Sequence, residues 1–129
     1  MGSRILVVIE SPYAGDVARN VAYARRCVRD SLLRGEAPIA SHLLHTQRGI
    51  LDDNKPEERV DGIAAGHAWI PVADFVAVYT DHGISGGMYA GMAAARAAGV
   101  VITYRQIGAE PQATSGQPLV PADFLRTEP

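Results

Sequence analysis

The stretch "DFVAVYTDHGISGGMYAGMAAARAAGVVITYR" (74–105) predicts a complete strand–helix–strand unit. Its two ends, 74–80 and 100–105, are short runs rich in β-branched and aromatic residues, as is typical of strands. The alanine-rich run 87–98 between them favours a helix. A crossover helix of this kind joins parallel strands of one sheet with a right-handed connection.

The chain before this unit continues the same alternation. "RILVVIE" (4–10) is an apolar run of the kind that forms a strand buried on both faces of a parallel sheet. From Asp16 to Arg34, apolar residues recur every three or four positions, which predicts a helix with Asp16 as N-cap and Gly35 just past its end. "APIASHLL" (37–44) predicts a second strand.

A further helix is predicted after a polar loop, with Asn54 as N-cap and Pro56 in its first turn. Its apolar face is expected to comprise Val60, Ile63, Ala64, His67 and Ile70. We therefore expect an α/β fold, a single-domain Rossmann-like (flavodoxin-like) parallel sheet with flanking helices over residues 1–107. Residues 108–129 are rich in Pro, Gly and small polar residues and are expected to form an irregular C-terminal tail.

Composition narrows the classes of partner. The 129 residues are 47% hydrophobic and 20% charged, with a net charge of −2 and no basic run, so polymeric nucleic acid is not an expected partner. The single Cys27 cannot form an intramolecular disulfide, which fits a reducing compartment. The apolar run 5–9 is too short for a signal sequence or a membrane span. We expect a cytoplasmic protein without a membrane partner.

Ligands of such sheets bind beyond the carboxyl ends of the strands, near the point where the strand order reverses. That rule predicts one rim formed by "ESPYAGD" (10–16), "SHLLHTQ" (41–47), "YTDHGISGG" (79–87) and Arg105. His42 and His45 suggest a metal site, but their spacing does not suit a strand and no cysteine supports them. We expect neither a metal nor a cofactor.

The glycine-rich loop is the main candidate site. It lacks the pattern of a Walker A loop or of a dinucleotide-binding loop. It does offer Ser85 and the backbone N–H groups of Gly86, Gly87 and Met88 at a helix N-terminus, a position that binds phosphate or carboxylate. The alternative is a plain turn whose glycines permit a positive φ.

Other polar groups are expected at the same rim. Tyr13 can stack on a base or hydrogen-bond a sugar or phosphate, although a simple capping turn would explain the residues around it equally well. Asp81 directly follows a strand and adjoins the glycine loop. Asp52 and Asp53 lie in a loop that is either solvated or reaches over the site.

Four segments together resemble a known group of proteins: "SPYAGDVARNVAYARR" (11–26), "PIASHLLHTQ" (38–47), "LDDNKPEER" (51–59) and "DHGISGGMYAGMAAARAAGV" (81–100). They are similar to small bacterial and phage proteins of the nucleoside 2-deoxyribosyltransferase-like superfamily, in the DUF4406/DUF7768 group. The resemblance runs from about residue 5 to residue 105. It implies binding of a nucleoside or nucleoside 5′-monophosphate, cleavage or exchange of its N-glycosidic bond, and assembly as a homodimer or larger homo-oligomer.

The resemblance also points to individual residues. Tyr13 resembles the aromatic residue near the ligand, Asp16 and Asn20 match a "GD…N" signature, and Asp81 matches the acid before the glycine loop. The candidate catalytic residues are thus Asp81 and Tyr13. The candidate substrate-binding residues are Ser11, Gly15, Asp16, Asn20, His42, Asp53, Ser85, Gly86, Gly87 and Met88.

One position departs from the superfamily. Its enzymes carry a glutamate on the helix after the glycine loop, and the pattern S-x-G-M-x-x-E would place it at Gly91. Cleavage of a glycosidic bond passes through an oxocarbenium-like state that a nearby carboxylate stabilises. Either Asp81 or an acid of "LDDNKPEE" (51–58) supplies that carboxylate, or the protein binds a nucleotide without cleaving it, as a sequestering or sensing protein. A third reading, an interaction protein with a vestigial pocket, is disfavoured because the other motif residues are present.

Overall fold

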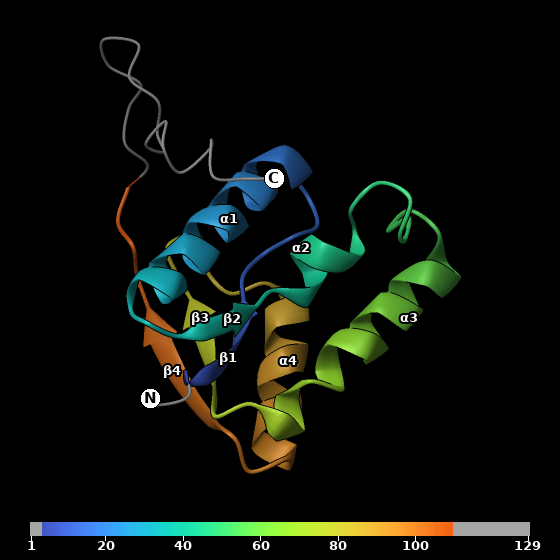
Figure 1. Cartoon of the computed structure of the whole chain (residues 1–129). Coiled ribbons are helices and arrows are strands. Elements are labelled where there is room, and N and C mark those ends of the chain that lie inside the picture. The colour runs from blue at the N-terminus through green and yellow to red at the C-terminus, as the bar shows by residue number, and fades with distance from the viewer. Residues whose placement is uncertain (1–3, 110–129) are drawn as a thin grey trace, which may run out of the picture.

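Four parallel strands form one sheet with helices on both faces (Figure 1). The computed structural model describes residues 4–109. The strands are β1 (Leu6–Glu10), β2 (Ala37–Ile39), β3 (Phe75–Tyr79) and β4 (Val101–Arg105), in the order β2-β1-β3-β4. The predicted class, a parallel α/β sheet with flanking helices, is confirmed. Most of the predicted tail lies outside the described residues.

The strand order places a switch point beside β1. The chain leaves β1 toward β2 on one side and later returns to β3 on the other side. In the register of β1 and β3, Glu10 pairs with Val78. A crevice beyond the carboxyl ends of β1 and β3 is therefore the expected ligand position for this topology.

Alternate residues of the strands face two separate cores. Helix α1 (Val17–Leu33) covers one face, where Val7 and Ile9 pack in the same buried cluster as Tyr23 and Cys27. Helix α4 (Gly86–Ala97) belongs to the other face, where Val8 shares a buried cluster with Met88, Met92 and Ala95. The parity of β1 therefore places Glu10, like Val8, on the α4 face.

Of three predicted boundaries, one holds and two do not. Asp16 caps α1 by accepting a hydrogen bond from the Arg19 N–H at 3.2 Å, as predicted. The prediction of a strand over 37–44 is wrong in its second half, because β2 has only three residues at the sheet edge and α2 (Ser41–His45) follows. Asn54 is not a helix cap, because α3 (Pro56–His67) begins after Lys55.

Helix α3 lies to the side of the sheet and packs mainly on α2 (Figure 1). The close contact is at Gly66, where an added Cβ would lie 3.0 Å from the Cβ of Ser41. The predicted apolar face of this helix is mostly uncovered, since Val60 and Ile63 are exposed and only Ile70, in the short helix η1 (Ile70–Val72), is buried. Across residues 4–109, every helix is too short or too polar to cross a membrane.

Candidate functional site

A cavity of about 320 Å³ opens at the carboxyl end of the sheet. Its walls come from the loop after β1, from α2 and α3, and from the first turns of α4. The volume lies at the lower end of the range for small-molecule sites. Of the residues predicted for binding or catalysis, it brings together Tyr13, Ser11, His42, Asp53, Ser85, Gly86, Gly87 and Met88.

The first turn of α4 contributes open backbone to this cavity. Ser85 caps the helix by accepting a hydrogen bond from the Met88 N–H at 3.3 Å, so that N–H already has a partner. Gly86 and Gly87 stand in the first helical turn, whose N–H groups have no acceptor within the helix. A Cβ on Gly86 would meet nothing within 4 Å, and one on Gly87 only the Ser85 Oγ at 4.0 Å.

Gly86 and Gly87 do not have a positive φ, so the backbone conformation does not require glycine at either position. The glycine of this loop with a positive φ is Gly83. Packing within the described residues does not require them either. Their small size therefore leaves room at the cavity wall.

The last residue of β1 places a carboxyl group at the cavity. Glu10 lines it, and a Cβ built on Gly91 would lie 2.5 Å from the Glu10 Cδ and closer still to Oε2. Gly91 thus leaves the space that the Glu10 carboxyl occupies. Burial raises the pKa of Glu10 from 4.5 to about 8. The sequence predicts Glu10 at the rim but assigns it no catalytic or binding role. Its position at the end of a strand, on the same face as Val8, is the signal that could have indicated one.

The wall beside Glu10 is formed by a histidine and two hydroxyl side chains. The Ser11 Oγ and the His42 Nε2 are hydrogen-bonded at 2.8 Å. Burial lowers the pKa of His42 to about 4, so its ring is neutral at pH 7. The Tyr13 ring stands edge-on to it, with centroids 6.5 Å apart. The buried Ser11 hydroxyl thus contacts the imidazole, and its role in substrate binding stays a prediction.

The loop before α3 closes the outer side of the cavity. Asp53 lines it and accepts a hydrogen bond from the Arg59 guanidinium at 2.7 Å, so its charge is paired. Glu58 accepts one from the Asp52 N–H at 2.9 Å and lies 3.5 Å from the Lys55 Nζ. Among residues 4–109, no three His, Cys, Asp or Glu side chains gather as a metal site.

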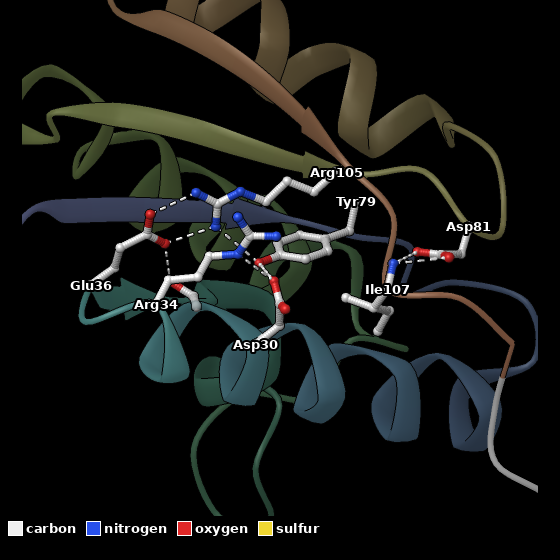
Figure 2. A network of polar contacts seen from close by, with 8 residues as sticks. Asp30, Arg34, Glu36, Tyr79, Asp81, Arg105 and Ile107 are labelled. Atoms are coloured by element: carbon white, nitrogen blue, oxygen red, sulfur yellow. Dashed lines mark hydrogen bonds and ion pairs between the residues drawn. The ribbon is translucent and has the colours of Figure 1, made fainter.

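Asp81 does not line the cavity. Its carboxylate accepts a hydrogen bond from the Ile107 N–H at 3.0 Å (Figure 2). It also accepts hydrogen bonds from the Tyr23 hydroxyl at 2.6 Å and from the Gly108 N–H at 2.9 Å. Burial alone would raise the pKa of Asp81, but these hydrogen bonds hold it below its ordinary value. The carboxylate therefore ties the segment after β4 to the loop after β3, and its catalytic role stays a prediction.

Three other candidates shape the loop that carries Tyr13. Asn20 donates hydrogen bonds to the carbonyl oxygens of Tyr13 and Ala14 at 2.9 and 3.1 Å. Gly15 adopts a φ of 101°, which favours glycine, and Asp16 caps α1. None of these three lines the cavity.

Arg105 was expected at the rim, but its guanidinium lies on the α1 face of the sheet. It pairs with Glu36 at 2.6 and 2.7 Å and donates to the Tyr79 hydroxyl at 3.1 Å (Figure 2). The Tyr79 hydroxyl in turn donates to Asp30 at 2.8 Å. The long Arg105 side chain extends along the α1 face of the sheet. The network therefore joins β3 and β4 to the end of α1 and to Glu36, just before β2.

Comparisons with known proteins agree with the fold. The sequence model of a family described as a domain of unknown function, DUF7768, matches residues 5–105. No curated protein matches the chain. A solved structure of 2-deoxyribosyltransferase from the psychrotolerant bacterium Bacillus psychrosaccharolyticus is similar with a TM-score of 0.56 and 16% sequence identity. The match covers 83% of this chain and 76% of that one, and at this identity it establishes the fold.

Proposed function

The chain belongs to the DUF7768 family, and we propose that its cavity binds a nucleoside or nucleoside 5′-monophosphate and supports cleavage or transfer at the N-glycosidic bond. One observation carries the proposal. A single cavity is lined by the open first turn of α4, at Gly86 and Gly87, and by the rings of Tyr13 and His42.

The two sides of the cavity suit the two ends of such a ligand. The N–H groups and dipole at the start of α4 favour a phosphate. The rings of Tyr13 and His42, which line the same cavity, offer an apolar surface and a phenolic hydroxyl for a base or sugar. The similar fold of a 2-deoxyribosyltransferase, described as a biocatalyst for synthesis of nucleosides, supports the ligand class. The net charge of −2 favours a small molecule over polymeric nucleic acid.

The second candidate function is binding without cleavage. It is favoured by Gly91, which has no side chain where the resemblance implies a glutamate, and by Asp81, whose carboxylate is engaged by Tyr23 and by backbone N–H groups. A protein of this kind would sequester or sense a nucleotide.

A panel of nucleosides and their 5′-monophosphates separates the two. Release of free base, followed by chromatography, is the result expected of the leading proposal. Saturable binding by calorimetry without release would favour the second candidate. Absence of both across purine and pyrimidine ligands would contradict the proposal as a whole.

A further inference from the structure

We propose that Glu10 is the catalytic acid of this cavity, an inference that rests on the proposed cleavage of an N-glycosidic bond. Its position carries the proposal. Glu10 ends the central strand β1, beside the switch point between β1 and β3, and lines the cavity on the α4 face. Its carboxyl occupies the space that a side chain at Gly91 would fill.

The contacts of the carboxyl point to a ligand as well. Within residues 4–109, it makes no hydrogen bond or ion pair to the protein. A partly buried carboxyl without a protein partner is costly to the fold and is a mark of functional sites. Glu10 and Gly91 also fit each other sterically. The Glu10 carboxyl has room beside α4 because residue 91 of that helix has no side chain.

Burial keeps Glu10 protonated at neutral pH, and the titratable groups that face the cavity come from several elements. Tyr13 faces the cavity from the loop after β1, and His42 and His45 from α2. From 53–67 come Asp53, Glu58, Arg59 and His67. Helix α4 touches Glu10 at Gly91, and its titratable side chains, Tyr89 and Arg96, do not line the cavity. Burial is the cause of the raised pKa of Glu10, about 8.

The step that follows is hydrolysis with Glu10 as general acid and then base. The bond between the anomeric carbon and the base nitrogen breaks with its electron pair passing to the nitrogen, which takes the proton of Glu10. A water oxygen bonds to the anomeric carbon and gives one proton to the Glu10 carboxylate. Base and free sugar leave, and the acid is restored.

The test compares base release by the wild type, Glu10→Gln and Gly91→Ala with the nucleoside and monophosphate panel. Asp61→Asn, which removes an exposed carboxylate of α3 outside the cavity, is the control and should match the wild type. Glu10→Gln keeps the shape and should lower kcat at least about a hundredfold while the ligand still binds. Wild-type kcat should fall as pH rises through about 8, and the residual rate of Glu10→Gln should lack that fall.

Gly91→Ala tests the geometry without touching the acid. The added Cβ displaces the far end of the flexible Glu10 side chain, so kcat should fall while the melting temperature changes little. This variant also covers the case in which Glu10→Gln does not fold.

The outcomes are distinguishable. If Glu10→Gln and Gly91→Ala release base at the wild-type rate, the role of Glu10 is wrong and the proposed function stands. If the wild type binds the ligands but releases no base, the catalytic role of Glu10 is overturned and the binding function stands. If the wild type neither binds nor cleaves, both proposals are wrong.

Discussion

Glu10 is expected to lower the stability of the fold at neutral pH. The unfolded chain loses this proton near pH 4.5, whereas the folded chain keeps it to about pH 8. The free energy of unfolding is therefore highest below about pH 4.5, where both states are protonated. It falls as pH rises above 4.5, and the loss is complete once pH has risen through 8. The glutamine of Glu10→Gln does not titrate. The stability of this variant relative to the wild type should therefore increase from pH 5 to pH 8. Urea unfolding at both pH values measures this, and a difference independent of pH would contradict it.

Asp81→Asn is expected to affect stability more than chemistry. The substitution replaces one carboxylate oxygen by an NH2 group, which cannot accept a hydrogen bond. The carboxylate now accepts hydrogen bonds from the N–H groups of Ile107 and Gly108. Loss of hydrogen bonds to a charged group costs about 1.5–3 kcal/mol. The free energy of unfolding at pH 7 should fall by about that amount, with base release per folded molecule within about threefold of the wild type.

Two further results check the role of Asp81. Because its pKa is lowered in the folded state, its contribution is present above the ordinary value of 3.8 and is lost as pH falls below it, so the two proteins should converge in stability there. Tyr23→Phe, which removes one donor to the same carboxylate, is the matched control and should lose less stability. A hundredfold loss of base release with unchanged stability would instead support a catalytic Asp81.

The sequence predicts much of the cavity, including Asp53, but not the role proposed for Glu10. Tyr13, Ser85 and the two glycines follow from the rule that parallel strands end at one rim. Asp81 and Glu10 both stand at strand ends, and no sequence pattern tells which is engaged by the protein. The distinction depends on tertiary contacts. The partners of Asp81 are 26, 27 and 58 residues away along the chain, and Gly91 of α4 contacts Glu10 at the end of β1.

At the scale of elements, the first turn of α4 is expected to bind phosphate. Gly86→Ala places a methyl group in open space at the cavity wall, so folding should be unimpaired and the helix slightly stabilised. The same methyl group should hinder a phosphate at the helix N-terminus.

Thermal shifts measure this effect. The wild type should be stabilised more by a nucleoside 5′-monophosphate than by the matching nucleoside, and Gly86→Ala should narrow that gap. The nucleoside alone is the internal control. Equal shifts for both ligands in the wild type would identify the segment as a turn only.

Helices with strong periodicity are predictable here, and short edge elements are not. Asp16 and Gly35 bracket α1 as expected, since capping and termination depend on local residues. "SHLLH" (41–45) follows a strand so short that its apolar residues extend the strand pattern, yet it turns into α2 once pairing with β1 ends. Where an edge strand stops depends on its neighbour in the sheet, which no local pattern contains.

For the whole molecule, the alternation of strands and helices was sufficient to predict a parallel α/β sheet. It was not sufficient to predict which surfaces remain open. The periodic apolar residues of α3 predict one apolar helix face, and in the structure much of that face is open: Val60 is 67% exposed and Ile63 is 45% exposed. The periodic spacing of apolar residues predicts that a helix face is apolar. It does not predict whether the same chain or a second protein molecule covers that face.

We expect the chain to form at least a homodimer. Trp69 is 49% exposed beside a shallow apolar hollow at the sheet edge, which Leu6, Ile39 and Val72 also line. The sequence also offers Met92 and the apolar tail residues Leu119, Val120 and Phe124 as candidate subunit contacts. Met92 is buried in the α4 core, and the three tail residues lie outside the described residues.

A charge at this hollow should weaken assembly, because burying it without a partner is costly. Trp69→Glu should shift the mass from dimer toward monomer by light scattering, with the circular dichroism of the folded chain retained because the side chain is half exposed. Asp61→Asn, an exposed substitution on α3 that does not line this hollow, should leave the mass unchanged. The mass of the wild type at micromolar concentration is measured first. A monomeric mass would contradict the predicted homodimer and show that these side chains are exposed to water.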